Sequence, residues 1–128
     1  ADEVDRKGVR IIVPERAAYE LYLSRTIKNA ELIKEKGGDA SFQRFVDEKF
    51  DALAGLKPRL ISDQVKMPGS KIVEGRFTAV QQAAGVPKGR TAAAKYLSSF
   101  IEDVKASGLV AKAIKDNKVV GLTIAAKA

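Results

Sequence analysis

The sequence predicts an α/β domain with a mainly parallel sheet and helices on both faces. A run of β-branched residues at 9–13 stops at Pro14, and a helical pattern of apolar residues starts directly after it. Strand-type segments then alternate with helix-type segments through residue 77, as in sheets whose parallel strands are joined by helical crossovers. The length of 128 residues suits one compact domain with a modest core.

The first unit of this pattern is a buried strand, a short loop and a helix. The helix is expected over residues 17–28, where Leu21 and Tyr22 follow Ala17 at helical spacing. Such a unit leaves the first N–H groups of the helix free at the end of the sheet, where a small anionic group binds. The stretch therefore indicates a ligand-binding α/β protein, although it does not name the ligand.

The second strand–helix pair is expected over residues 30–50. Residues 30–34 alternate as a strand does, and two glycines end that segment. Asp39 is a favourable N-cap for the helix that follows. Four large apolar residues of this stretch share one face: Phe42, Phe45, Val46 and Phe50.

A third pair and a fourth strand complete the first part of the chain. Residues 51–55 form a small apolar strand, and residues 57–67 a helix whose first turn tolerates Pro58. Three apolar residues of that helix are expected to face the sheet: Leu60, Ile61 and Val65. Residues 71–77 are expected to form the fourth strand. Ligands of such sheets bind beyond the carboxyl ends of the strands.

The pattern changes after residue 77, so we divide the chain into an α/β core at 1–77 and a second segment at 78–128. An extended stretch leads to a long helix at 91–107, which Thr91 is expected to cap. Five residues form its apolar stripe: Ala94, Leu97, Phe100, Ile101 and Val104.

The end of the chain is expected to hold one more helix. Gly108 ends the long helix, and residues 109–115 form a short one. Residues 119–125 fit either a final strand or an extended tail.

Composition excludes several kinds of site. The chain has no Cys and no His, which excludes disulfides, thiol catalysis, Ser–His and Cys–His triads and most zinc sites. Its carboxylates do not follow a calcium-loop pattern, so we expect no metal and no cofactor. No apolar run approaches the roughly 20 residues that span a bilayer.

The net charge of +7 requires that nucleic-acid binding be weighed. The 23 basic residues are interspersed with acidic ones, and they form no block and no basic-aromatic stacking motif. We therefore interpret the charge as a basic soluble surface and expect no nucleic-acid partner.

Four stretches of the chain resemble one protein family. They are GVRIIVPERAAYELYLSRTIKNAELI at 8–33, KFDALAGLKPRL at 49–60, FTAVQQAAGVPKG at 77–89, and AAAKYLSSFIEDVKASGLVAKAIKDN at 92–117. In this order they resemble the second lobe and C-terminal segment of bacterial periplasmic solute-binding proteins of ABC transporters. The resemblance is to the amino-acid-type receptors, which have the type II periplasmic-binding fold, and it covers almost the whole chain.

The resemblance implies a partner for this chain. Members of the family hold a small solute between two α/β lobes, and the closed form docks on an ABC permease in the membrane. It implies that a first lobe precedes Ala1, with a signal peptide before it, and a periplasmic location. The segment near 78–86 would return to that lobe. The apolar stripe at 91–107 would then be covered by the missing lobe or by a swapped partner chain.

The resemblance also places a binding loop after the first strand. In amino-acid receptors a small hydroxyl residue and neighbouring N–H groups of this loop hold the ligand carboxylate. The matching residues are Arg16, Ala17, Ala18 and Tyr19. The hydroxyl is absent, but the N–H groups remain, and Arg16 adds a cation for a carboxylate. The alternative is that the alanines only favour the helix and that Arg16 is solvated.

A second departure from the family concerns the ligand's ammonium group. The receptors place an acidic residue after the third strand, where this chain has Leu56. Either Asp51 or the missing lobe supplies the charge, or the ligand has no ammonium group. Lys57 and Arg59 follow directly and favour an anion, unless both are simply solvated.

These observations predict a non-enzymatic solute-binding component of an ABC importer, for a small anionic or zwitterionic solute. One alternative is a cyclohexadienyl-dehydratase-like enzyme on the same fold, for which Glu15 and Glu20 are the candidate acids or bases. The other alternative is a standalone interaction domain that uses its basic surface.

Overall fold

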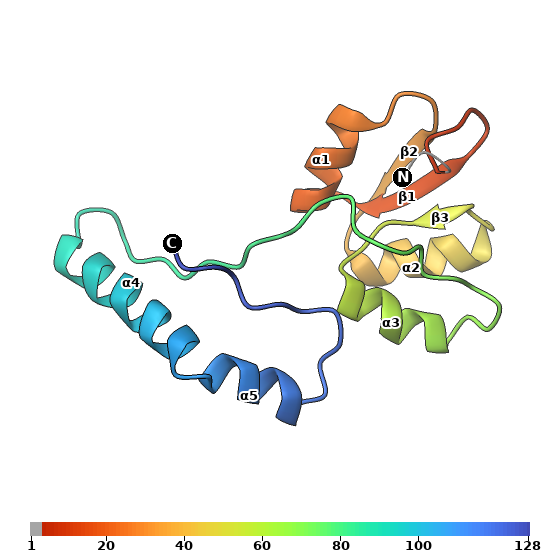
Figure 1. The fold of residues 1–128 in the computed structure, drawn as a ribbon. Coiled ribbons are helices and arrows are strands. Elements are labelled where there is room, and N and C mark those ends of the chain that lie inside the picture. The colour runs from red at the N-terminus through yellow and green to blue at the C-terminus, as the bar shows by residue number, and fades with distance from the viewer. Residues whose placement is uncertain (1–3) are drawn as a thin grey trace. The chain divides into compact units, whose positions relative to one another are not determined.

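The run of β-branched residues forms the central strand of a three-stranded sheet. In the computed structural model, which describes residues 4–128, β1 (Arg10–Pro14) lies between β2 (Glu31–Glu35) and β3 (Ala52–Leu53). Both neighbours run parallel to β1. Figure 1 shows the sheet with the helices that follow its strands. The expected α/β fold with a parallel sheet is thereby confirmed.

Each strand is followed by one helix. These helices are α1 (Ala18–Thr26), α2 (Gly38–Asp47) and α3 (Lys57–Val65). Parallel neighbours require such crossovers because the chain must return to the same edge before each new strand. The carboxyl ends of the strands and the N-termini of α1, α2 and α3 therefore lie at one edge of the sheet.

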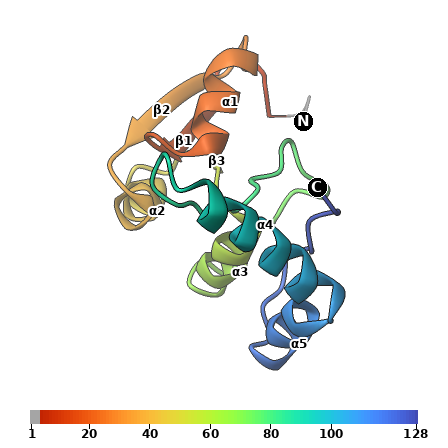
Figure 2. The same ribbon diagram turned by 90° about the vertical axis from the view of Figure 1, so that its left-hand side faces the viewer.

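Both faces of the central strand are covered. Ile11 and Val13 point to one face, where they form the core cluster with Leu23 of α1 and with Ala54. Ile12 points to the opposite face because side chains alternate along a strand, and it is fully buried. Helix α2 packs against all three strands, and in Figure 2 α1 and α2 lie on different sides of the sheet.

The start of α2 differs from the prediction. Gly37, not Asp39, occupies the N-cap position, with φ 83° and ψ 158°. Only glycine adopts this backbone conformation readily, so the turn into the helix occurs two residues earlier than the polar signal indicates. Asp39 lies in the first turn of α2, where it pairs with Arg59 of α3 at 2.6 Å.

The expected fourth strand is wrong. Residues 71–77 contain no strand and pair with none of the three strands of the sheet. Gly75 has φ 81°, which interrupts the extended run, and charged residues leave the segment little apolar surface to bury. Phe77 instead packs on Tyr22 of α1, with 5.9 Å between ring centroids. Val65 is 80% exposed, so its expected orientation toward the sheet is also wrong.

The chain divides into two compact units, Ala1–Val80 and Gln81–Ala128. The second unit holds α4 (Thr91–Ala106) and α5 (Leu109–Asp116), which follow one another and are in contact. Gly108 separates them with φ 79°, as expected for a residue that ends a helix.

The second unit has no buried core of its own. None of the residues of α4 or α5 is buried, and Tyr96 on α4 is 73% exposed. Arg90 rather than Thr91 is the N-cap of α4, and no side chain caps it. Residues 119–125 form neither a helix nor a strand, which decides the open alternative in favour of an extended tail.

Candidate functional site

The candidate site is the edge of the sheet where the three parallel strands end. Because β1 lies between the other two strands, the loop that precedes α1 is flanked by the loops that precede α2 and α3. The predicted binding residues before α1 and before α3 therefore meet at one edge. This is the position where open α/β sheets bind ligands.

The three helices at this edge begin with free backbone donors. The first intrahelical bonds run from the N–H groups of Leu21, Ser41 and Leu60 to the N-cap carbonyl oxygens, at 3.1, 3.1 and 2.9 Å. Earlier N–H groups have no partner within the helix. None of the three helices has a side-chain cap at its N-cap residue. The free donors and the positive end of each helix dipole favour a small anion.

The loop between β1 and α1 contains the four residues predicted to bind the carboxylate. Arg16 is exposed and has φ 63°, a left-handed conformation that is uncommon for a residue with a side chain. Ala17 is the N-cap of α1, and Ala18 is its first residue. Tyr19 packs against the core cluster. Burial raises the pKa of its hydroxyl, and the opposing effect of the Arg59 charge is smaller. Tyr19 is thus at least partly a packing residue.

Leu56 and Lys57 begin α3 at the same edge. Leu56 is the N-cap residue and is 43% exposed, and Lys57, the first helical residue, is exposed as well. Since β3 neighbours β1, the exposed ammonium group of Lys57 and the guanidinium group of Arg16 belong to adjacent loops. Both cations favour an anionic ligand group.

Asp51 is not part of this edge. The sequence offered Asp51 or the missing lobe as the negative charge for a ligand's ammonium group, and the structure corrects the first of these. It precedes β3, at the amino end of the strand, whereas the candidate site lies beyond the carboxyl ends. Its Oδ2 accepts a hydrogen bond from the Arg10 N–H at 2.8 Å. Asp51 therefore ties the starts of β1 and β3 together and is too far along the strand to meet a ligand.

Arg59 is committed to carboxylates of the protein. Its Nε lies 2.8 Å from Asp63 Oδ2, and its Nη2 lies 2.6 Å from Asp39 Oδ1. These two carboxylates raise the pKa of Arg59. Arg59 therefore joins α3 to the start of α2. The sequence predicted that Arg59 favours an anionic ligand, but its guanidinium group mainly pairs with these two carboxylates.

Glu20 is a buried carboxylate at this edge. It is 3% exposed, and its Oε1 lies 2.7 Å from Lys34 Nζ and accepts a hydrogen bond from Ser24 Oγ at 2.6 Å. Its Oε2 accepts a hydrogen bond from the Arg16 N–H at 3.0 Å. These partners, Lys34 first, lower the pKa of Glu20 to about 2.

This environment makes Glu20 a poor general acid or base near neutral pH, because its proton affinity is far from the working range. The sequence indicated Glu20 only as a helix-dipole partner or a candidate catalyst. The i, i+4 spacing of Glu20 and Ser24 was a usable signal for their hydrogen bond. The contact with Lys34 depends on the fold, since that residue comes from β2. Glu15 uses its backbone N–H to bond Glu35 O at 2.8 Å.

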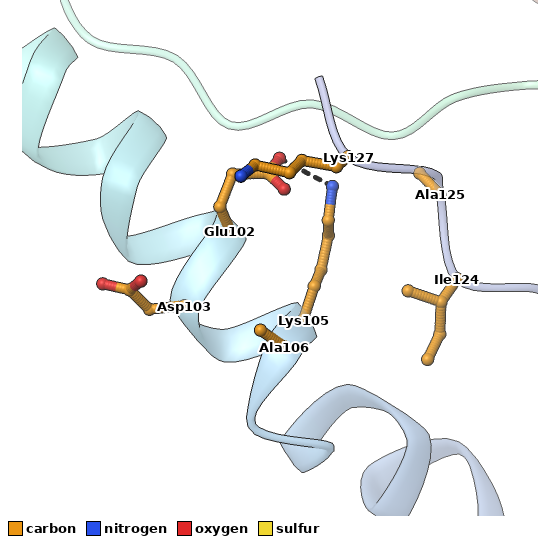
Figure 3. Close-up of a pocket in the computed structure, with 7 residues that line it drawn as sticks. All are labelled: Glu102, Asp103, Lys105, Ala106, Ile124, Ala125 and Lys127. Atoms are coloured by element: carbon orange, nitrogen blue, oxygen red, sulfur yellow. Dashed lines mark hydrogen bonds and ion pairs between the residues drawn. The ribbon is translucent and has the colours of Figure 1, made fainter.

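The second unit contains a shallow hollow of about 330 Å³ between α4 and the C-terminal tail. Figure 3 shows Lys105 reaching toward Glu102, with Ile124 and Ala125 of the tail facing them. Lys105 Nζ lies 2.7 Å from Glu102 Oε1 and donates to Ala126 O at 2.9 Å. The ammonium group of Lys105 is thus already paired with Glu102 and the tail, so the hollow is a weaker candidate site than the sheet edge.

Residues 4–128 contain neither a metal-ligating cluster nor a membrane-spanning helix. No group of three or more acidic side chains in that part of the chain is arranged to hold a metal ion. No helix formed by those residues is long and apolar enough to cross a membrane.

Comparisons of the chain with known protein families, with curated proteins and with solved structures found no match.

Proposed function

We propose that this chain is the second lobe and C-terminal segment of the solute-binding component of an ABC importer, a periplasmic protein. It would bind a small amino acid or another carboxylate-bearing solute between two lobes and deliver it to a membrane permease. The observation that carries the proposal is the sheet edge at which α1, α2 and α3 all begin without a side-chain cap. The sequence resemblance to one lobe of the type II periplasmic-binding fold supports the same conclusion.

The charges at the edge favour the carboxylate of the solute. Arg16 and Lys57 are exposed beside free helix N–H groups, which together suit a carboxylate. Leu56 cannot neutralise an ammonium group, and Asp51 lies at the opposite edge. A solute without an ammonium group, or one whose ammonium group binds to the first lobe, fits these residues best.

The second unit supports the presence of a further packing partner. Three large side chains of α4, Tyr96, Phe100 and Ile101, are exposed, and no residue of that helix is buried. Exposed apolar stripes of this kind are normally covered in the working protein. A first lobe or a swapped partner chain would provide that cover.

The proposal is tested by titrating the ¹⁵N-labelled chain with sodium acetate, with chloride keeping the ionic strength constant. We expect saturable amide shifts at Ala18, Tyr19 and Glu20, with weak affinity because half of the contacts are absent. Arg16→Asn removes the guanidinium group and keeps a residue that tolerates positive φ, so it should weaken acetate binding. Arg25→Gln, in the last turn of α1, removes the same charge far from the edge and is the matched control.

Uniform shifts over the surface, or no shifts at the start of α1, would contradict the anion site. Tight, saturable calorimetric binding of a solute by this chain alone would contradict its assignment as half of a two-lobed receptor.

A further inference from the structure

Glu20 connects the binding loop to the rest of the sheet. Its Oε2 accepts the N–H of Arg16 at 3.0 Å, while its Oε1 is held by Lys34 of β2 at 2.7 Å and by Ser24 at 2.6 Å. The side chain of Glu20 is 4% exposed, whereas that of Lys34 is 48% exposed. The carboxylate is therefore a fixed point, anchored from the strand side, to which the loop backbone is attached.

The loop needs such an attachment. Arg16 is held at φ 63°, a left-handed conformation that a residue with a Cβ adopts only at a cost in free energy. The N-cap residue that follows, Ala17, has no polar side chain with which to fix the first turn of α1. The hydrogen bond from Arg16 to Glu20 is the side-chain contact that spans the loop and the first turn.

We propose that Glu20 is a positioning residue of the anion site. It keeps Arg16 in the left-handed conformation, so that the Arg16 guanidinium group and the free N–H groups of Ala18 and Tyr19 converge on one carboxylate. This inference rests on the proposed function, because it assigns a role within the same site.

Lys34 explains how a carboxylate is tolerated so close to an anion. Its ammonium group lies 2.7 Å from Glu20 Oε1 and offsets the negative charge that would otherwise repel the ligand. Lys34 therefore contributes to the site from the neighbouring strand, β2, through Glu20.

The experiment compares acetate titrations of the ¹⁵N-labelled chain and of two variants. Glu20→Gln removes the charge and weakens the contact with the Arg16 N–H. Glu20→Asp keeps the charge for Lys34 but is one methylene too short to reach that N–H. Both variants should weaken acetate binding roughly two- to tenfold, as expected for the loss of one well-placed hydrogen bond. In the ligand-free chain, the Arg16 amide should exchange with solvent faster in both variants.

Glu31→Gln is the matched control, because it makes the same substitution at an exposed carboxylate at the amino end of β2, away from the loop. It should leave acetate binding and Arg16 exchange near wild type. Dispersed signals of Ile11 and Val13 verify that each variant is folded. The direction of the change in acetate affinity for Glu20→Gln is decisive. If Glu20 affected the site only by repelling the anion, the neutral variant would bind acetate more tightly than wild type.

The outcomes separate this inference from the proposed function. Wild-type binding with unchanged or tighter binding by Glu20→Gln, and an unchanged Arg16 amide, would overturn the positioning role alone. A wild-type chain without acetate shifts at the start of α1 would overturn the proposed function and, with it, the role of Glu20 in that site.

Discussion

Arg59 Nε lies 2.8 Å from Asp63 Oδ2, four residues further along α3. The side chain of Asp63 is 5% exposed, while that of Arg59 is 41% exposed. The second oxygen of Asp63, Oδ1, is buried without a hydrogen-bond partner. The carboxylate therefore depends on a single cation at its other oxygen, and this dependence gives the first prediction.

Replacing Arg59 with Gln should leave the charge of Asp63 buried and uncompensated. We expect a loss of about 1–3 kcal/mol in the free energy of unfolding, toward the lower value because Arg59 is partly hydrated. Urea unfolding measures the change. The double variant Arg59→Gln/Asp63→Asn should recover most of it. Asp39→Asn, at an Arg59 partner that is 95% exposed, should cost less than about 1 kcal/mol. Equal losses for Arg59→Gln and Asp39→Asn would contradict this account.

Glu20 should make the stability of the chain depend on pH in the acid range. Its pKa falls from 4.5 to about 2 on folding, so the stabilisation is present above about pH 4.5 and is lost as the pH falls toward 2. Thermal unfolding between pH 7 and pH 3 should show a smaller decline for Glu20→Gln than for wild type. Glu31→Gln, exposed at the start of β2, is the control. Parallel profiles for wild type and Glu20→Gln would exclude the lowered pKa.

Two adjacent glycines should respond in opposite ways to replacement by alanine. Gly37→Ala puts a side chain at φ 83° and ψ 158°, so it should destabilise the fold by about 1–3 kcal/mol. At Gly38 a Cβ would meet only Arg59 Nη1 at 3.8 Å, an ordinary contact, and Gly38 is the first residue of α2. Gly38→Ala should be neutral or stabilising by up to about 1 kcal/mol. Similar unfolding midpoints for the two variants would argue against Gly37 as the N-cap.

The central strand should carry much of the core stability. Ile12 is fully buried, so Ile12→Ala should cost about 2–5 kcal/mol and Ile12→Val about 0.5–1.5 kcal/mol in urea unfolding. Val65→Ala removes a similar apolar group at a position that is 80% exposed, and it should change stability by less than about 0.5 kcal/mol. A cost for Val65→Ala that matched Ile12→Val would show that α3 is covered in solution.

Hydrogen exchange should separate the two units. Amides of β1 lie in the middle of a buried sheet, while α4 has no buried residue. We expect amides of β1 to exchange at least roughly 100-fold more slowly than those of α4. Measurements at two protein concentrations supply the control, because protection of α4 that increases with concentration would identify a second copy as its cover. Equal protection of β1 and α4 in the monomer would contradict the exposed state of the second unit.

The sequence alone determined the order of elements in the first unit, because that information is local. The β-branched run before Pro14 and the 3.6-residue spacing after it define a strand and a helix within a few neighbouring residues. The same reasoning located the later helices to within a few residues and Gly108 as the end of α4. Arg16 and Lys57 were singled out through the resemblance to the periplasmic receptors, and the parallel sheet of the structure places their loops at one edge.

Only the tertiary structure decided which side chains meet. The order β2-β1-β3 brings Lys34 against Glu20, and it brings Asp51 against the Arg10 N–H at the amino ends of the strands. Neither contact has a local signal in the sequence. Residues 71–77 contain the apolar pair Ile72 and Val73, yet none of the three strands pairs with them. Burial and pairing depend on residues distant in the chain, whereas periodicity reports only on near neighbours. The sequence thus indicated which residues follow the strands of the sheet, and the fold decided which side chains hold those loops in place.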